Sequence, residues 1–516
     1  MSKPRQKVEL ATTDAGRQYA CLTTPREQFW EPGSLARGSR HKLGAELARC
    51  GIYLRDQSDR EQIAAMIAAA TPYAGAPPID QPGFSGPHFA FADGSIMSPP
   101  DAVPGPYIGE INASKRLIGS FEGWSDGVGG RLKGQHLPKT AVQLALAAPL
   151  VALGMLSQQP LIIELVLPNA AAGAPLMAIW RSILGQLSLS CSGALTFPDV
   201  LELSKNGKDL FRDLLHVVRD ADLILAAASS ASRRAQVSKF LCDAGQRSRP
   251  QSYILLNTRP MSDLVGAGTE LATLIDARTI KLVLGTDRSL GVFDRHPAGE
   301  PDIASFSRSL EAAASHHQGH LMNSFISRLV LKLAQDEAGL REMITERIQV
   351  FKSRAGIDQH DGQPCHAANT FGLIYAAGWL AESWGLLPNY GHPGNSPRIC
   401  LQTLLSRLPK SKPFDEELAL LARDPETVHL GYGQVTPEPS MTRTAAVLVR
   451  HHKNRRELMV RSQAINRVFP NWTARLSTPE VQARLIREDT RIQVRRRLVA
   501  GEPQELTYSF RLPDLE

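Results

Sequence analysis

The chain has 516 residues, of which 43% are hydrophobic and 21% charged, and its formal net charge is +7. This composition excludes collagen-like, coiled-coil and wholly disordered proteins, while the length allows two to four domains of roughly 100–200 residues each. Residues 441–516 carry 15 Lys and Arg against 8 Asp and Glu, so the other 43 basic and 43 acidic residues cancel and a polyanionic partner is expected near the C-terminus.

The cysteine pattern and the apolar runs indicate the compartment. The six cysteines are far apart and form no CxxC pair, which favours a reducing compartment over a disulfide framework or a zinc ribbon. The N-terminus lacks the apolar segment of a signal peptide. The most apolar stretch, residues 141–156, is shorter than the about 20 residues that span a bilayer. We therefore predict a cytoplasmic protein with no membrane contact.

Residues 1–75 are predicted to form a small N-terminal α/β region. Within it, residues 39–54 have the pattern of a helix leading into a strand, and residues 59–70 have apolar residues at helical spacing. The Pro- and Gly-rich stretch 71–87 predicts a domain boundary. An Asp-Gly pair between two short strand-like runs predicts a hairpin over residues 88–97.

Residues 76–300 alternate between strand and helix patterns, which predicts an α/β core with a mostly parallel sheet. The run LIIELVL at 161–167 suits a strand buried on both faces. Residues 194–220 are predicted to form a short strand followed by a helix. Further buried strands are expected at 221–229, 252–258 and 278–285.

Residues 301–395 are predicted to be a helical subdomain. Three helix-like runs fill it, at 302–335, 338–356 and 365–385. The sequence LLPNYGHPGNSP at 386–397 breaks the helical pattern and predicts the end of this unit.

The loop after 161–167 stands where a phosphate-binding loop is expected, but its sequence lacks the chemistry. Such a loop needs backbone N–H groups around the phosphates, a Lys, and a Ser or Thr that holds magnesium together with an acidic residue. Only Gly173, Ala174 or Pro175 can fill the Lys and Thr slots, and the strand predicted at 221–229 ends in Ala226–Ala228 where acids belong. No other segment matches GxxxxGK[ST]. We therefore predict a degenerate site without ATP or magnesium.

Five segments in order along residues 40–390 carry a family resemblance. They are HFAFADGSIM, GSFEGWSDGVGGRLKGQHLPKTAVQLALAAPL, GVFDRHP, AAASHHQGHLMNSFISRL and FGLIYAAGWLAESWGLLP. The chain resembles domain-of-unknown-function family 927, whose members are P-loop ATPases, many of them helicase-like proteins of phages, plasmids and integrated mobile elements. Members carry an STGKTT-like loop where this chain has AAAGAPL, and Asp-Glu where it has Ala227 and Ala228.

The resemblance also implies where remnants of a nucleotide site would lie. Asn257 and Thr258 match the position that senses the γ-phosphate, and a former subunit-interface arginine would be one of Arg247, Arg249 and Arg278. The alternative is that each is an ordinary solvated or capping residue. No catalytic residue and no metal site are predicted, although the segments HHQGH and HDGQPCH contain potential zinc ligands.

Residues 396–516 are predicted to form a basic, winged-helix-like module. A helix over 477–488, with Ser477 and Glu480 in capping-box spacing, precedes a hairpin over 490–512, and residues 455–469 supply a strand and a helix. Its arginines suit phosphate contacts, unless they form only a solvated basic face. The predicted nucleic-acid-binding residues are Arg455, Arg456, Arg484, Arg487, Arg491, Arg495, Arg496 and Arg497.

Three functions are compatible with these features. The leading hypothesis is a non-catalytic pseudo-ATPase related to mobile-element helicases, which binds DNA or RNA. It would act as an assembly scaffold in a replication, mobilisation or defence complex, as a homo-oligomer or with other mobile-element or defence proteins. The first alternative is an active ATPase or helicase with an unusual or partner-supplied site. The second is a structural interaction protein with no nucleic-acid role.

Overall fold

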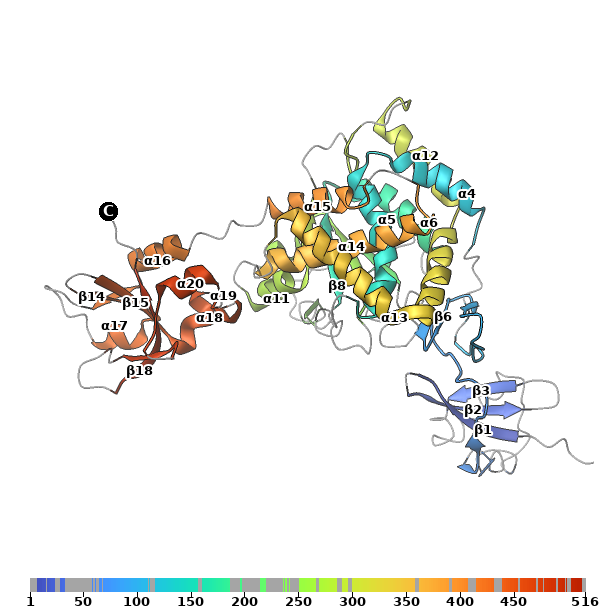
Figure 1. Cartoon of the computed structure of the whole chain (residues 1–516), viewed down its shortest axis with the longest axis horizontal. Helices are drawn as coiled ribbons and strands as arrows, with labels where there is room; N and C mark the ends of the chain where they lie inside the picture. The colour runs from blue at the N-terminus through green and yellow to red at the C-terminus, as the bar shows by residue number, and fades with distance from the viewer. Residues whose placement is uncertain are drawn as a thin grey trace, which may run out of the picture. The chain divides into compact units, whose positions relative to one another are not determined.

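The computed structural model describes most of the chain in segments, and all structural statements below concern these residues. The main described segments are 7–14, 16–23, 28–32, 68–109, 117–155, 160–185, 195–196, 214–219, 250–265, 269–284, 290–295, 299–357, 362–388, 392–406, 414–430, 439–452, 455–469, 472–476, 478–488, 491–496 and 503–512. By compactness the chain divides into two units (Figure 1), Met1–Gly356 with Ala367–Leu404, and Ile357–His366 with Leu405–Glu516. The four-part division expected from the sequence stays a prediction.

The N-terminal region contains a four-stranded sheet that the sequence patterns above did not reveal. Strands β1 (Lys7–Thr12), β2 (Gln18–Thr23) and β3 (Gln28–Pro32) pair antiparallel in order, and β4 (Thr71–Pro72) adds parallel to β1. The predicted helix at 39–54 lies outside the described residues. The predicted hairpin at 88–97 is confirmed by the antiparallel pair β6 (His88–Ala90) and β7 (Ile96–Met97), which β5 (Gly83–Ser85) extends.

The first unit is built on a five-stranded, all-parallel sheet, as the sequence predicts. Its strands are β8 (Leu161–Val166), β9 (Leu195–Thr196), β10 (Leu215–Arg219), β11 (Ser252–Asn257) and β12 (Ile280–Val283), in the spatial order β12-β8-β11-β10-β9. From β8 the chain passes to the β9 edge, returns through β10 and β11, and crosses to β12 beyond β8. The winding therefore reverses around β8, and ligands of open α/β sheets bind at the carboxyl ends of strands beside such a reversal.

One helix prediction was wrong. The run LHVVR, expected in a helix, is strand β10, which lies between β9 and β11. All five of its residues are in the sheet, and the described ones are buried because a central parallel strand is covered on both faces. The run is only about one helical turn long, so a helical period could not be distinguished from continuous burial. The strand predicted at 221–229 lies outside the described residues.

Helices cover this sheet. Helix α5 (His136–Ala152) packs against β10, β11 and α6 (Ala174–Leu184), and α5 and α6 lie side by side in Figure 1. The indole N–H of Trp180 on α6 donates to the carbonyl of Ala141 on α5 over 2.9 Å. Short helices α4 (Phe121–Trp124), α10 (Met261–Leu264) and α11 (Glu270–Arg278) complete the core.

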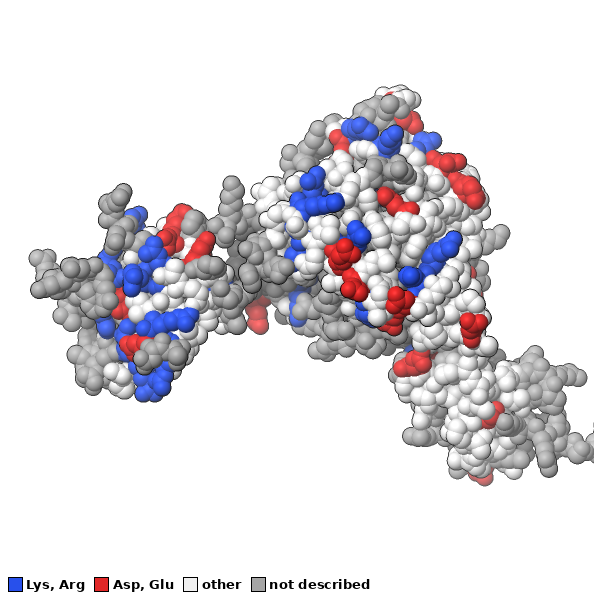
Figure 2. All heavy atoms as spheres, in the orientation of Figure 1, with Lys and Arg blue, Asp and Glu red and all other residues white. Residues whose placement is uncertain are grey.

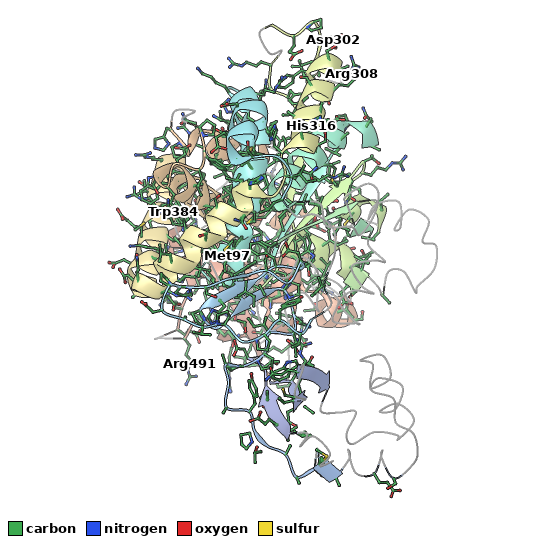
Figure 3. All side chains as sticks on the ribbon, turned by 90° about the vertical axis from the view of Figure 1, so that its right-hand side faces the viewer. Met97, Asp302, Arg308, His316, Trp384 and Arg491 are labelled. Atoms are coloured by element: carbon green, nitrogen blue, oxygen red, sulfur yellow. The ribbon has the colours of Figure 1, made fainter. Side chains whose placement is uncertain are left out.

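The predicted helical region is confirmed, with one additional break. Helix α12 (Ile303–His316) begins at Asp302, whose carboxylate accepts the Ser305 N–H over 2.6 Å (Figure 3), and it ends before the left-handed Gly319. Helix α13 (His320–Ala355) is interrupted at Asp336, whose carboxylate accepts the Gly339 N–H and so caps the second half. Helices α14 (Gly362–Ser383) and α15 (Asn395–Leu405) follow. No described helix combines the length and apolar character needed to cross a bilayer.

The second unit contains a six-stranded sheet in the order β13-β14-β15-β18-β16, with β17 also paired to β18. Its strands are β13 (Val428–Leu430), β14 (Val447–His452), β15 (Arg455–Arg461), β16 (Leu485–Ile486), β17 (Val494–Arg496) and β18 (Glu505–Arg511). Its helices are α16 (Phe414–Arg423), α17 (Pro439–Thr444), α18 (Ile465–Val468), α19 (Trp472–Arg475) and α20 (Pro479–Arg484).

The core of the second unit is aromatic. Phe414, Phe469, Trp472, Tyr508 and Phe510 are buried together, with ring centroids 5.0–5.8 Å apart. The predicted hairpin is confirmed by the antiparallel pairing of β17 with β18. The predicted helix at 477–488 is confirmed only for α20 (Pro479–Arg484), because Thr478 is its N-cap and Leu485–Ile486 form strand β16. The sheet is larger than this hairpin, and the winged-helix assignment stays a prediction.

Candidate functional sites

The loop at the carboxyl end of β8 has the position of a nucleotide site. The strand is followed by a 3-10 turn, Ala170–Gly173, and then by α6, so the predicted order of strand, loop and helix is confirmed. The first glycine slot of GxxxxGK[ST] holds Pro168, and Gly173 holds the second. Ala174 and Pro175 then occupy the lysine and hydroxyl slots.

The loop uses its own backbone donors. Asn169 caps the turn, because its side-chain oxygen accepts the Ala172 N–H over 2.9 Å. The Ala174 N–H donates to the carbonyl of Ala171, and the Leu167 N–H donates to the carbonyl of Asn257 over 2.7 Å. Pro175 is buried and has no N–H. The N–H groups of Ala172 and Ala174 are therefore engaged inside the turn, and Pro175 supplies none.

Asn257 serves the protein core. Its side chain is 1% exposed and donates to the Glu164 carboxylate over 2.8 Å. The same carboxylate oxygen accepts the Met261 N–H over 2.8 Å, and Glu164 is fully buried in the middle of β8. Thr258, the neighbouring predicted residue, is exposed. Sequence reasoning missed Glu164, although a single acid inside LIIELVL was the signal.

Of the three predicted interface arginines, the structure describes one. Arg278 is the last residue of α11 and is partly exposed, whereas Arg247 and Arg249 lie outside the described residues. Ala226–Ala228 also lie outside them. Because the strand beside β11 ends at Arg219, the residue that follows it in the chain is Asp220, with Asp222 two positions later. The prediction that alanines replace the acids of the nucleotide site therefore stays a prediction.

Two of the segments that carry the family resemblance, those containing α5 and α12–α13, pack against α6. Ser182 on α6 is fully buried, its hydroxyl accepts the Trp124 indole N–H over 2.9 Å, and its carbonyl accepts the Gly319 N–H over 2.8 Å. His317 accepts the Ser120 N–H at Nδ1 over 3.2 Å. These residues hold the scaffold together. In the described part of the chain, no group of three His, Cys, Asp or Glu side chains is arranged to hold a metal ion.

The start of α5 carries a polar network with a shifted carboxyl pKa. Gln135 exchanges hydrogen bonds with the backbone of Asp294 and Arg295, and the Asp294 carboxylate accepts the His136 N–H. Along α5, burial lowers the pKa of Lys139. Burial raises the pKa of Glu382 on α14 from 4.5 to about 7, against the charge of Lys139.

Glu382→Gln is expected to stabilise the first unit at pH 8 by about 1 kcal/mol, after allowance for solvent screening at this half-buried site. The folded chain keeps the Glu382 proton up to about pH 7 while the unfolded chain releases it near 4.5, so wild-type stability falls between these values. Urea unfolding at pH 4 and pH 8 should show the gain only at pH 8. Glu346→Gln, at an exposed position, is the control. Equal gains in stability at both pH values for Glu382→Gln would contradict a raised pKa of Glu382.

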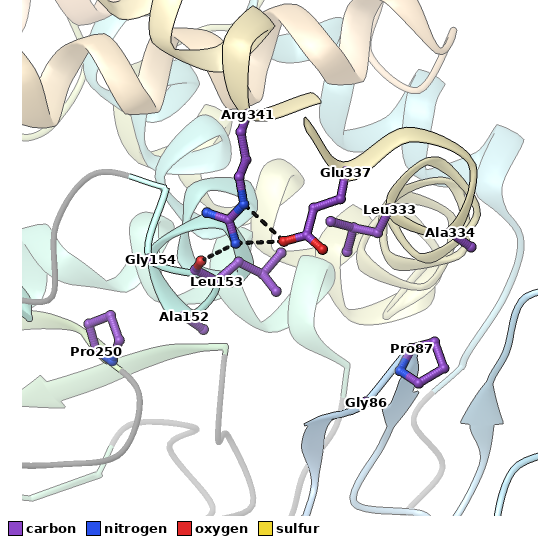
Figure 4. Close-up of a pocket in the computed structure, with 10 residues that line it drawn as sticks. All are labelled: Gly86, Pro87, Ala152, Leu153, Gly154, Pro250, Leu333, Ala334, Glu337 and Arg341. Atoms are coloured by element: carbon purple, nitrogen blue, oxygen red, sulfur yellow. Dashed lines mark hydrogen bonds and ion pairs between the residues drawn. The ribbon is translucent and has the colours of Figure 1, made fainter. Parts of the chain in front are cut away.

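A cavity of about 460 Å³ lies at the opposite edge of the sheet (Figure 4). It is lined by the end of α5 and the residues after it (Ala152–Gly154), by Pro250 just before β11, by Gly86 and Pro87, and by α13 on both sides of its break. The Arg341 guanidinium faces it but is bound to Glu337 over 2.8 Å and to the carbonyl of Leu153 over 3.1 Å. Because the cavity is at the amino ends of the strands, it is not the site expected from the sheet topology.

Two predicted nucleic-acid-binding arginines are engaged within the second unit. Arg484 forms a two-pronged ion pair with Asp415 on α16, over 2.8 and 2.6 Å. Arg496 binds the buried Glu457 on β15 over 3.0 Å and also binds Glu488. These guanidinium groups tie secondary-structure elements together, as carboxylate pairs of this geometry do. Their role as phosphate ligands stays a prediction, and in the structure their guanidinium groups are paired with carboxylates.

The remaining predicted arginines differ in exposure. Arg487, Arg491 and Arg495 are exposed, and Arg487 also donates to the side chain of Gln482. Arg456 is partly exposed. The side chain of Arg455 and all of Arg497 lie outside the described residues. On the face shown in Figure 2, basic and acidic atoms of the second unit lie beside one another.

Comparison with known proteins gives one informative likeness. No family model matches the chain, and no curated protein matches it. The chain is similar in structure to the solved "SCCmec type IV Cch - active helicase", with a TM-score of 0.57 and 10% sequence identity. The match covers 99% of this chain and 94% of the helicase chain. At this identity the likeness shows the fold, which agrees with the parallel α/β core.

Proposed function

We propose that this protein is a non-catalytic relative of mobile-element helicases of the family 927 kind, which keeps the P-loop fold as a scaffold. The observation that carries the proposal is the closed loop after β8, in which Asn169 caps the turn and Pro175 replaces a hydroxyl residue. The structural likeness to an active helicase over nearly the whole chain supports the helicase-like part. The second unit, as a winged-helix-like module, binds nucleic acid, and the surplus of seven positive charges in residues 441–516 supports this.

A second candidate function is an active ATPase or helicase. In the sequence, Asp220 comes directly after β10 and Asp222 two positions later, and P-loop enzymes hold magnesium with an acid that follows a strand of the sheet. In this case a partner subunit supplies the missing lysine. The absent loop chemistry favours the first proposal, because the lysine and the hydroxyl residue are both replaced within this chain.

Wild-type protein is expected neither to bind ATP nor to hydrolyse it above a buffer blank, with or without DNA. A variant that restores the loop, Pro168→Gly with Ala174→Lys and Pro175→Thr, should gain ATP binding, because it regains the lysine and a backbone donor. Titration with a fluorescent ATP analogue and a phosphate-release assay measure both. Adding Asp220→Asn to the restored variant tests whether this acid supports hydrolysis. Wild-type turnover near 1 s⁻¹, an ordinary enzyme rate, would exclude the pseudo-ATPase.

The scaffold role is tested by purification with and without nuclease, followed by light scattering. A homo-oligomer, or a complex with other mobile-element or defence proteins, is expected to persist after nuclease treatment, while bound nucleic acid is lost. A monomer that carries neither nucleic acid nor protein would favour the structural interaction protein without a nucleic-acid role.

A further inference from the structure

The aromatic side chains of the second unit are committed to its core. Residues 405–516 contain six Phe, Tyr and Trp residues, and Phe414, Phe469, Trp472, Tyr508 and Phe510 are at most 7% exposed. The sixth, Tyr432, lies outside the described residues. Proteins that bind single-stranded nucleic acid stack its bases on exposed aromatic rings, which contributes about 1–3 kcal/mol per base. The five described rings are packed against one another and present no open face for a base.

The exposed arginines instead lie along one border of the sheet, which we call the β16–β17 edge (Leu485–Arg496). Both strands pair with the same side of β18, with Leu485 opposite Phe510 and Arg495 opposite Leu506. Arg487, Arg491 and Arg495 are exposed along this edge. It therefore presents guanidinium groups without stacking partners among the described side chains.

The edge is held by internal contacts that fix its spacing. Arg496 connects β17 to Glu457 on β15 and to Glu488 in the connection between the edge strands. The Arg491 N–H donates to the carbonyl of Glu488 over 3.0 Å. Exposed cations on an edge held in this way suit a polyanion with regularly spaced phosphates, and duplex DNA carries about one charge per 1.7 Å of its axis.

We infer that the β16–β17 edge binds the phosphate backbone of a nucleic-acid duplex through Arg487, Arg491 and Arg495. This inference rests on the proposed function and specifies its ligand: a double strand, held by charge and without reading its bases. Phosphate contacts orient a protein on the duplex and carry no direct sequence information. Binding should therefore be similar for unrelated sequences and should weaken steeply with salt.

The test measures fluorescence anisotropy of labelled 20-residue strands, single or as DNA and RNA duplexes, with the full chain at several salt concentrations. The duplex is expected to bind at least about 10-fold more tightly than its single strand. The triple variant Arg487→Ala, Arg491→Ala, Arg495→Ala should lose about 10- to 100-fold in duplex affinity and lower the salt slope by two to three, at about 0.9 per phosphate contact. Comparison of the DNA duplex with the RNA duplex shows which of the two nucleic acids the edge binds more tightly.

The charge-matched control replaces three exposed arginines elsewhere, Arg308, Arg328 and Arg423, by alanine. Its duplex affinity should change less than about 3-fold, because it removes only diffuse charge. Equal losses in both triple variants would overturn the inference, as would tighter single-strand binding that Tyr432→Ala abolishes. If neither single strands nor duplexes bind, the proposed nucleic-acid function itself fails.

Discussion

Arg496→Ala is expected to lower the free energy of unfolding of the second unit by about 3 kcal/mol, since it leaves a buried carboxylate without its cation. The Glu457 side chain is 5% exposed and the Arg496 side chain 16% exposed. Burial alone would raise the pKa of Glu457, because it disfavours the charged carboxylate. Hydrogen bonds from Ser509 and Arg496, with the attraction of Arg496 and Arg450, outweigh burial and keep the pKa of Glu457 below its ordinary value.

The neighbouring Arg495→Ala is the matched control, because Arg495 is exposed on the opposite face of β17 and should cost less than about 0.5 kcal/mol. Urea unfolding followed through the buried Trp472 measures both variants. A depressed carboxyl pKa stabilises the fold above the unfolded value and is lost as pH falls through the folded value. Wild type should therefore lose stability on acidification more steeply than Arg496→Ala. Equal unfolding midpoints for the two variants would contradict a stabilising role of the ion pair between Arg496 and Glu457.

Glu164→Leu is expected to destabilise the first unit by about 3–4 kcal/mol. The substitution removes the acceptor of both the Asn257 amide and the Met261 N–H, and each buried donor left without a partner costs about 1–3 kcal/mol. Leucine is close to glutamate in size, so the loss reports the hydrogen bonds more than a cavity. The effect should reach the loop after β8, because the carbonyl of Asn257 accepts the Leu167 N–H.

The control for this prediction is Glu164→Gln, which keeps one side-chain carbonyl oxygen as an acceptor and should cost about 1 kcal/mol. Urea unfolding gives the free energies, and hydrogen exchange shows whether the amides of β8 and β11 lose protection together. Equal stability of the leucine and glutamine variants would mean that the carboxylate does not organise this part of the sheet.

Continuous burial made much of the core predictable from sequence. The runs LIIELV and SYILLN each form strands with all six residues buried, and the break near Asp336 separates the two predicted helical runs. The run LHVVR was mistaken for helix because five residues cannot define a period. Strand β1 follows the alternation of polar and apolar residues in KVELAT, a pattern typical of a strand.

The partners of the arginines could not be predicted in the same way. Asp415 lies 69 residues before Arg484, and Glu457 lies 39 residues before Arg496. A charge count shows that residues 441–516 are basic, but only the folded sheet shows which guanidinium groups are neutralised inside it. For the loop after β8, missing chemistry was visible in the residue types, while the use of its N–H groups by Asn169 required the structure.

The strand order of the parallel sheet sets a delay during synthesis. Strand β8 lies between β11 and β12, and Asn257 on β11 comes 93 residues after its partner Glu164. At a ribosomal rate of about 5–20 residues per second, the nascent chain carries the apolar β8 for roughly 5–20 s before either neighbour exists. During this interval LIIELV has no native strand to pair with, so chaperone binding to the growing chain should protect this segment first.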